Sequence, residues 1–178
     1  MPPICPRCGL TQASGILCPN CVGWQAEIDG IRAPFRFEGL TRQAVHQLKY
    51  RNIRALAPPL AQLLKDYLIK NSIPGEVLVP VPLHRRRLKE RGYNQSGLLA
   101  KELGKLTNLP VVDNCLTRER HTSPQARTTT VEERRSNVND AFTCRDQRLS
   151  GKQVLLIDDV STSGATLDAC AAALKASG

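Results

Sequence analysis

Residues 154–166 read Val-Leu-Leu-Ile-Asp-Asp-Val-Ser-Thr-Ser-Gly-Ala-Thr. The four aliphatic residues at the start predict a β-strand that is covered by protein on both faces. Two acids end this strand, and the small residues after them predict a tight loop. Apolar residues then recur at helical spacing, at Leu167, Cys170 and Leu174. The stretch therefore predicts a strand, a loop and a helix in succession, which is the repeating unit of an α/β fold.

The same alternation occurs earlier in the chain. Residues 77–81 form a second apolar run, and Asn94 is placed to cap the helix that follows it. A weak strand is predicted at 110–112, and amphipathic helices are predicted over 40–50 and 56–68. Because strands alternate with helices, the sequence predicts an α/β fold with a parallel sheet.

The loop that opens the last helix suits a phosphate group. Its small and hydroxylated residues, Ser161 to Thr166, let backbone N–H groups approach an anion, and the helix adds its positive N-terminal end. Asp158 and Asp159 would repel a phosphate, so we expect them to hold hydroxyl groups or magnesium at the carboxyl edge of the sheet. The stretch matches neither GxxxxGK[ST] nor GxGxxG. The alternative is an acid pair that only ends a strand before a capped helix.

Basic residues outnumber acidic ones, 25 to 16, and the net charge is +9. This excess favours an anionic partner, either a phosphorylated small molecule or nucleic acid. Residues 84–91 include five Lys or Arg and follow the first strand, so a parallel sheet places them at the same edge as Asp158. They are alternatively a solvated helix face or a contact for a nucleic-acid backbone. The polar segment from Arg118 to Arg135 suggests a mobile lid or a disordered linker.

Four cysteines form two CxxC pairs near the start, Cys5 with Cys8 and Cys18 with Cys21. Two such pairs predict a structural zinc site, and four thiolates leave no open position for catalysis. Redox chemistry and an iron–sulfur centre are the alternatives. The other cysteines, Cys115, Cys144 and Cys170, stand alone in apolar stretches and are expected to be buried thiols without a role.

Several classes of protein are excluded by composition. The longest aliphatic runs have four residues, whereas a membrane helix needs roughly 20. The start of the chain has no secretory signal, so we expect a cytoplasmic protein. Aromatic residues make up only 4% and are scattered, which argues against a stacking platform for RNA bases.

The stretch 154–166 resembles the phosphoribosyl-pyrophosphate (PRPP) motif of type I phosphoribosyltransferases. The resemblance implies that the catalytic acids Asp158 and Asp159 bind the ribose hydroxyls of PRPP together with Mg²⁺. The residues it implies for the 5-phosphate are Ser161, Thr162, Ser163, Gly164, Ala165 and Thr166. The family also has a pyrophosphate-binding turn after the first strand and a lid that excludes water. The candidates for these two parts are His84, Arg85, Arg86, Arg87, Arg91, Arg118, Arg120 and Arg134.

Further segments resemble the ComF family (ComFC and GntX-like proteins). Besides the CxxC pairs, the matching segments are 48–50, 79–87, 91–95, 116–125 and 133–142. The resemblance implies a zinc ribbon with four cysteine ligands over 1–30, a type I phosphoribosyltransferase-like domain over 31–178, and an association with natural competence and DNA uptake. The chain stops at Gly178 where relatives continue into another strand, so a C-terminal strand is expected to be missing.

Two functions of different classes follow from these observations. The first is a PRPP-binding phosphoribosyltransferase-like protein that transfers the phosphoribosyl group to an unknown acceptor. The second is a non-catalytic PRPP sensor that binds single-stranded DNA and acts with a competence helicase resembling ComFA. A transcriptional regulator is a third alternative, although no helix-turn-helix precedes the domain. Turnover of PRPP to pyrophosphate separates the first function from the others.

Overall fold

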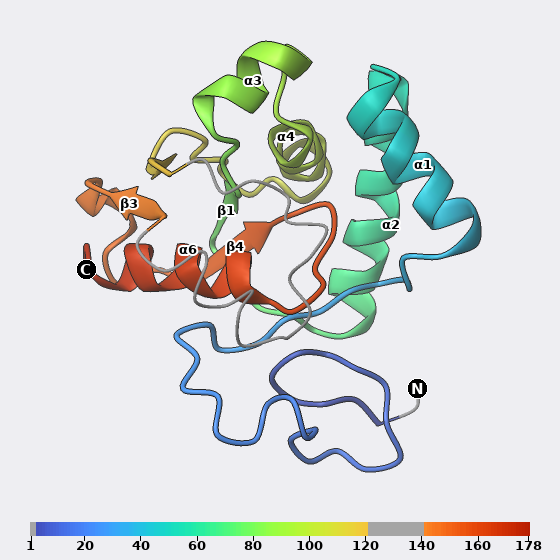
Figure 1. Ribbon diagram of the computed structural model, residues 1–178, viewed down its shortest axis with the longest axis vertical. Coiled ribbons are helices and arrows are strands. Elements are labelled where there is room, and N and C mark those ends of the chain that lie inside the picture. The colour runs from blue at the N-terminus through green and yellow to red at the C-terminus, as the bar shows by residue number, and fades with distance from the viewer. Residues whose placement is uncertain (1–2, 121–140) are drawn as a thin grey trace.

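A computed structural model describes residues 3–120 and 141–178 (Figure 1). The elements are, in chain order, α1 (Gly39–Tyr50), the 3₁₀ turn η1 (Arg54–Leu56), α2 (Ala57–Lys70), β1 (Val77–Pro80), α3 (Arg85–Arg91), α4 (Gln95–Thr107), β2 (Leu116–Arg118), β3 (Phe142–Cys144), the 3₁₀ turn η2 (Gln147–Leu149), β4 (Val154–Ile157) and α6 (Ala165–Lys175). No helix of the described residues is long and apolar enough to span a bilayer.

The centre of the molecule is a pair of parallel strands. β1 pairs with β4 in a register that runs from Val77 opposite Val154 to Pro80 opposite Ile157. This pairing confirms the prediction of an α/β fold with a parallel sheet. The weak strand expected at 110–112 is reduced to one parallel bridge, between Leu78 and Val111.

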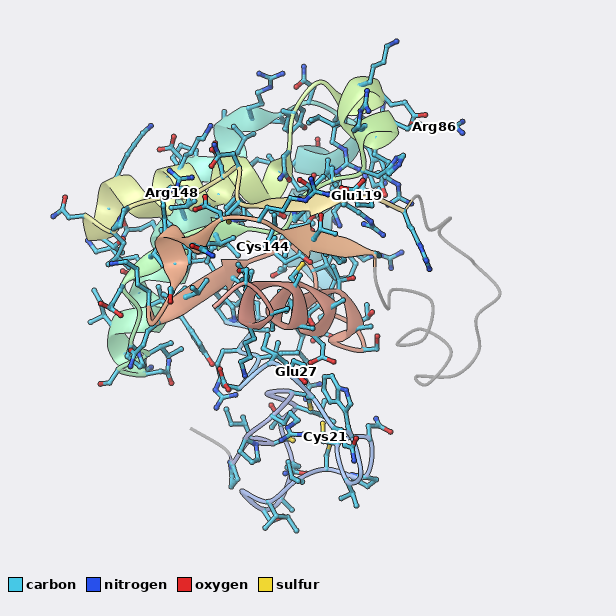
Figure 2. All side chains as sticks on the ribbon, turned by 90° about the vertical axis from the view of Figure 1, so that its left-hand side faces the viewer. Cys21, Glu27, Arg86, Glu119, Cys144 and Arg148 are labelled. Atoms are coloured by element: carbon cyan, nitrogen blue, oxygen red, sulfur yellow. The ribbon has the colours of Figure 1, made fainter. Side chains whose placement is uncertain are left out.

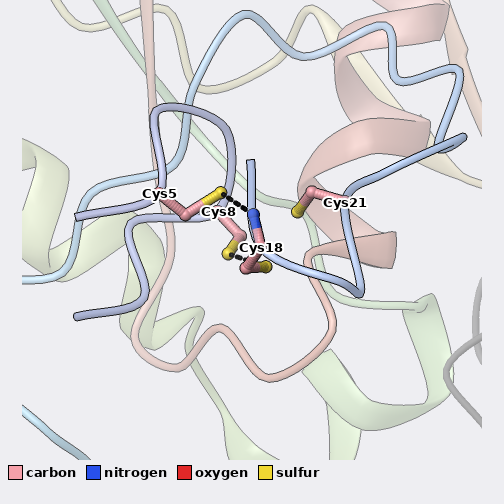
Figure 3. A group of neighbouring side chains, drawn as sticks. All are labelled: Cys5, Cys8, Cys18 and Cys21. Carbon is pink, nitrogen blue, oxygen red and sulfur yellow. Dashed lines mark hydrogen bonds between the residues drawn. The ribbon is translucent and has the colours of Figure 1, made fainter. Parts of the chain in front are cut away.

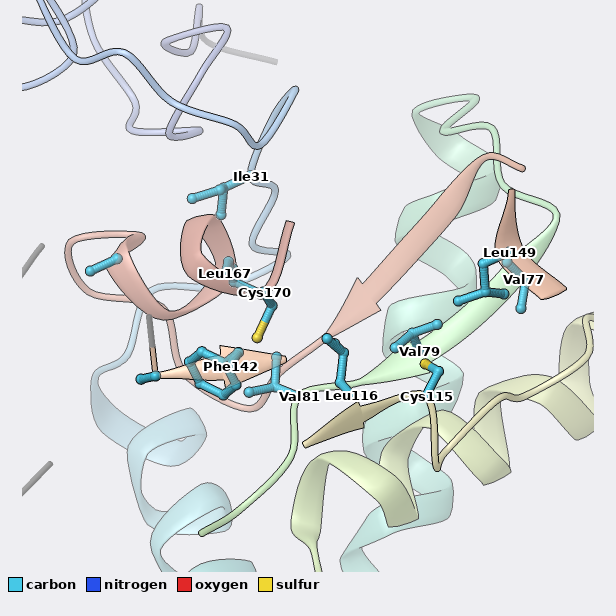
Figure 4. Close-up of a cluster of buried hydrophobic side chains, with 12 residues drawn as sticks. Ile31, Val77, Val79, Val81, Cys115, Leu116, Phe142, Leu149, Leu167 and Cys170 are labelled. Carbon is cyan, nitrogen blue, oxygen red and sulfur yellow. The ribbon is translucent and has the colours of Figure 1, made fainter. Parts of the chain in front are cut away.

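Helices and a small pair of antiparallel strands cover the two faces of this pair. On one face, Leu78 of β1 packs with α2 and α4, and the buried core includes Leu48, Leu99 and Leu103. On the other face, Val77 and Val79 pack with α6 and with the antiparallel pair β2–β3 (Figure 4). Successive side chains of a strand point to opposite faces, so β1 is buried along its whole length.

The strand β4 is less enclosed than its sequence predicts. Val154, Leu155 and Leu156 are only half-buried. Among the described residues, β1 is its one strand partner. A cavity of about 1100 Å³ lies beside β4 and reaches Asp158 and Ser161 at the end of the strand. The strand runs along this cavity, which explains its partial exposure.

The N-terminal segment, residues 3–38, lies against α6 and has little regular structure (Figure 1). Its only ladder contact is an antiparallel bridge between Ile4 and Thr11. Ile31 is buried in the core beside α6, and Trp24 and Ile28 pack against that core. The segment is therefore docked on the α/β part.

Candidate functional site

The predicted acids and the predicted basic cluster both follow the paired strands. Asp158 comes directly after β4, and α3 begins a few residues after β1. Because β1 and β4 are parallel and in register, their carboxyl ends meet at the same edge. This is the edge at which open α/β sheets bind ligands.

Asp158 accepts two hydrogen bonds on one oxygen. Ser96 Oγ donates to Asp158 Oδ1 over 2.9 Å, and the N–H of Asp159 donates to the same atom over 2.9 Å. Removal of the carboxyl from water, together with the neighbouring charge of Asp159, raises the pKa of Asp158 to about 7. Asp158 therefore changes its charge near neutral pH, whereas an ordinary aspartate stays ionised there.

Asp159 is held by a cation from a distant part of the chain. Lys49 Nζ lies 2.7 Å from Asp159 Oδ2, and only 3% of the Asp159 side chain is exposed. The Lys49 side chain is 20% exposed, so the pair is largely withdrawn from water. The two acids therefore differ in environment: Asp158 faces a hydroxyl, and Asp159 faces an ammonium group.

Sequence reasoning missed Lys49 and Ser96 as members of the site. Lys49 is in the last turn of α1, and Ser96 is in the first turn of α4. The Tyr93 hydroxyl donates to the Leu48 carbonyl and joins these two ends. A signal was present, because Lys49 lies within the 48–50 segment of the ComF resemblance and Ser96 directly follows the 91–95 segment. Nothing in the sequence places either residue beside the acids.

Asn94 fixes the start of α4 against the end of β1. Its side-chain oxygen accepts from the N–H of Ser96 over 3.1 Å, which confirms the predicted helix cap. Its side-chain nitrogen donates to the Val81 carbonyl over 3.0 Å. Ser96 is thereby positioned toward Asp158 by a residue that bridges strand and helix.

The predicted phosphate loop lies between the acids and α6. Ser161 and Thr162 are exposed, Ser163 is half-buried, and Gly164 and Ala165 are buried. Gly164 adopts a left-handed conformation with φ of 79°, and α6 begins after it without a side-chain cap. The first turn of α6 is therefore suited to contact an anion.

A Gly164→Ala substitution is expected to destabilise the protein by about 2–3 kcal/mol in urea unfolding. The left-handed backbone disfavours a Cβ, and the added atom would lie 2.6 Å from Ile31 Cδ1 and 3.0 Å from Trp24 Cη2. Gly151→Ala is the matched control, because Gly151 has a similar φ of 69° and no heavy atom within 4 Å of an added Cβ. Equal losses in the two variants would contradict the contact with the N-terminal segment.

Only some of the predicted basic residues approach the acids. Burial and the positive charge of Arg87 lower the pKa of Arg118, whereas the charge of Asp158 acts in the opposite direction. Arg118 therefore lies within electrostatic range of both Arg87 and Asp158. Arg118 is half-buried in β2, where its guanidinium stacks on Phe142 at 5.3 Å. Arg118 is therefore part of a strand, whereas the sequence pattern places it at the start of the predicted lid.

The remaining basic candidates have other surroundings. Arg86 points outward from α3 and pairs with Glu90, and the two side chains are 71% and 61% exposed (Figure 2). Arg91 donates to Gln95 and stacks on Tyr50. His84 caps α3 by accepting from the N–H of Arg86 over 3.3 Å. Arg85 and Arg120 are exposed, and Arg134, like most of the predicted lid, lies outside the described residues.

The four predicted metal ligands converge. The sulfurs of Cys5, Cys8, Cys18 and Cys21 lie within 4.8 Å of one another, and those of Cys8 and Cys18 are 3.6 Å apart (Figure 3). In a tetrahedral zinc site with Zn–S bonds of about 2.3 Å, the sulfurs lie about 3.8 Å apart. The donor set and its spacing therefore fit a metal such as zinc.

Local hydrogen bonds favour the thiolate form of one of these cysteines. Burial raises the pKa of Cys5, but backbone N–H groups of Cys18, Cys8 and Arg7 outweigh it and lower this pKa to about 6. Burial raises the pKa of Cys21. A metal ion would supply the positive charge that the buried thiolates need.

The isolated cysteines have the features of inert thiols. Burial raises the pKa of Cys115 to about 11 and that of Cys170 well above its usual value. Cys115 and Cys170 are buried in the core, and Cys144 is half-buried. Reactive cysteines need a stabilised thiolate, and Cys115 and Cys170 lack one.

Comparisons with known proteins extend over most of the chain. Competence protein F of Haemophilus influenzae is 29% identical over 174 residues, which are 93% of this chain and 76% of that protein. Competence protein ComFC of Bacillus subtilis is 28% identical, over 98% of this chain and 72% of that protein. No protein-family model and no solved structure matches the chain. The DNA utilization protein YhgH of Salmonella typhimurium is 31% identical over 92% of this chain and 74% of that protein, and the chain therefore belongs to the ComF family.

Proposed function

We propose that this protein binds PRPP with magnesium and acts in competence or DNA utilization. The acids Asp158 and Asp159 hold the ribose hydroxyls, directly or through Mg²⁺, for which carboxylate oxygens are suitable ligands. The loop from Ser161 to Thr166 holds the 5-phosphate. The observation that carries this proposal is the placement of an acid pair and a small-residue loop together at the carboxyl end of β4.

The basic residues complete this site in the proposal. Arg118 lies within electrostatic range of both Arg87 and Asp158, and in the proposal the two arginines contact the pyrophosphate of PRPP. In phosphoribosyl transfer, the bond between C1 of ribose and pyrophosphate breaks. An acceptor nucleophile forms a new bond to C1 and loses a proton. Cations near the departing pyrophosphate stabilise the charge that develops there.

The proposal includes a division of the chain into two parts. Residues 1–30 form a zinc ribbon, and residues 31–178 form a type I phosphoribosyltransferase-like domain around β1 and β4. The converging cysteines support the first part, and the parallel pair supports the second.

Calorimetric titration of PRPP with Mg²⁺ into the zinc-loaded protein tests the proposal. We expect binding to the wild type and loss of binding in the Asp158→Asn/Asp159→Asn variant. Lys101→Ala is the control, because Lys101 pairs with Asp113 on the exposed surface. The proposal fails if a folded wild type shows no heat of binding, or if the double variant binds as well as the wild type.

Binding of ribose 5-phosphate should depend on pH through Asp158. The carboxylate form accepts ribose hydroxyls, and with a pKa of about 7 its fraction rises roughly tenfold from pH 6 to pH 8. Propyl phosphate is the reference ligand, because it is a phosphate ester that titrates over a similar pH range but has no ribose hydroxyls. We therefore expect the affinity for ribose 5-phosphate relative to propyl phosphate to rise by about tenfold over this range. A constant ratio would contradict the role given to Asp158.

A second candidate is a protein that binds PRPP without turnover and contacts single-stranded DNA beside a helicase partner. Arg85 and Arg86 are exposed on α3, and the net charge of +9 favours a nucleic-acid backbone. The names of the relatives, Competence protein F and DNA utilization protein YhgH, agree with a role involving DNA. The test of this second candidate measures the affinity of the protein for single-stranded DNA at increasing salt concentration. A steep decline supports this candidate, and no binding even at low salt excludes it.

A further inference from the structure

The N-terminal segment contacts the predicted phosphate loop directly. Trp24 lies three residues after Cys21 and packs with the cysteine cluster. Trp24 and Ile31 also lie against Gly164 of the loop. A Cβ added at Gly164 would lie 3.0 Å from Trp24 Cη2 and 2.6 Å from Ile31 Cδ1. The bend that begins α6 is therefore in contact with a residue that also packs against the thiols.

Asp168 fastens the same segment to the first turn of α6. Its Oδ1 accepts from the N–H of Glu27 over 2.7 Å and from the N–H of Ile28 over 3.0 Å. At the other end of the helix, Lys175 Nζ donates to the Glu27 carbonyl and lies 3.1 Å from Asp29 Oδ1. The segment thus lies along the helix that the phosphate loop opens (Figure 2).

Two hydrogen bonds of Arg7 connect this contact to the first cysteine pair. Arg7, between Cys5 and Cys8, donates through its side chain to the Trp24 carbonyl. The Arg7 carbonyl accepts from the N–H of Ile31 over 2.6 Å. A continuous set of contacts therefore joins the cysteine cluster, through Trp24 and Ile31, to Gly164.

The N-terminal segment has little regular secondary structure to hold its shape. It contains one β-bridge and no helix among residues 3–38. A segment of this kind depends on its metal for a fixed conformation. Loss of the metal would release Trp24 and Ile31 from Gly164, whereas an anion that orders the loop would favour the docked segment.

We propose that metal binding by the four cysteines and anion binding by the loop 161–166 stabilise each other. Trp24, Ile31 and Asp168 are the positioning residues that carry this coupling. The identity of the anion, PRPP, rests on the proposed function. Because coupling between two sites is reciprocal, PRPP should tighten zinc by the factor by which zinc tightens PRPP.

The experiment measures how fast the zinc-loaded full chain loses zinc to a chromogenic chelator. At saturating PRPP with Mg²⁺, bound PRPP holds the segment docked and so acts on zinc dissociation; an affinity gain of about fivefold or more then slows this loss by the same factor. The Asp158→Asn/Asp159→Asn variant is the control, because PRPP should not bind to it. Any effect of PRPP on the rate of zinc loss from this variant comes from PRPP acting on zinc or the chelator in solution. Trp24 is the only tryptophan of the chain, so its fluorescence should follow the same time course.

Variants at Asp168 separate the coupling from binding itself. Asp168→Ala removes the acceptor for two N–H groups and should abolish the slowing by PRPP. Asp168→Asn keeps an oxygen acceptor and should restore it, and Lys101→Ala should behave as the wild type. If Asp168→Ala does not fold, the wild-type comparison with and without PRPP still decides.

The outcomes distinguish this inference from the proposed function. Calorimetric binding of PRPP with an unchanged rate of zinc loss overturns the coupling and leaves the proposed function intact. Absence of PRPP binding to the zinc-loaded protein overturns both. Slowing in the wild type that persists in Asp168→Ala overturns the role of Asp168.

Discussion

An Asp158→Asn variant is expected to be more stable than the wild type at pH 8, by about 2–4 kcal/mol, although it should lose PRPP binding. The pKa of Asp158 is about 7 in the folded protein and about 4 in an unfolded chain. The folded state therefore favours the protonated acid, and the associated stability is lost as the pH rises from about 4 through 7. Asparagine is uncharged at every pH, so it avoids this loss.

Urea unfolding at pH 5 and pH 8, with zinc present, measures this effect. The free energy of unfolding gained by the Asp158→Asn variant should be larger at pH 8 than at pH 5, because the wild-type acid is mostly protonated at pH 5. Asp113→Asn is the matched control, since Asp113 is 47% exposed in an ion pair with Lys101 and should change stability by less than about 1 kcal/mol. A variant less stable than the wild type at pH 8 would show that the desolvated carboxylate is compensated elsewhere.

A Lys49→Met variant should have the opposite effect and destabilise the protein at pH 8 by about 2–4 kcal/mol. The substitution keeps the length of the side chain but leaves the Asp159 carboxylate, 3% exposed, without its cation. Breaking one half of such a pair leaves an uncompensated charge away from water.

A double-mutant cycle checks the origin of this loss. Lys49→Met/Asp159→Asn removes both charges and should recover much of the stability that Lys49→Met loses. Lys101→Met is the control for removing a lysine from an exposed pair, and it should cost less than about 1 kcal/mol. If the double variant is no more stable than Lys49→Met, the ion pair does not account for the loss.

These two predictions explain why an acid pair of this kind points to a ligand. The folded protein holds one desolvated carboxyl with a raised pKa and one buried carboxylate that pairs with a cation from α1. Groups that lower stability in this way cluster at functional sites. Ser96 and Lys49 give the two acids different partners, a hydroxyl for Asp158 and an ammonium group for Asp159.

Much of the local structure could be predicted from the sequence. The aliphatic runs at 77–81 and 154–157 are parallel strands, Asn94 caps its helix, and the cysteine pairs converge. Each of these features depends on residues close together in the chain, through hydrophobic runs, capping side chains or short metal-ligand spacing. The same locality explains why the acids and the small-residue loop were recognised as one unit.

Other features depend on residues far apart in the chain, and only the tertiary structure decided them. Lys49 and Asp159 are distant in sequence, and so are Trp24 and Gly164. The sorting of the arginines is of the same kind, since Arg118 lies within electrostatic range of Asp158 whereas Arg86 points into solvent. By itself, the sequence determined the α/β elements, the acid pair with its loop, and the cysteine pairs, because short-range patterns specify them. Packing of helices on the parallel pair determined which cations reach the acids and what covers the loop, because those contacts exist only once the chain is folded.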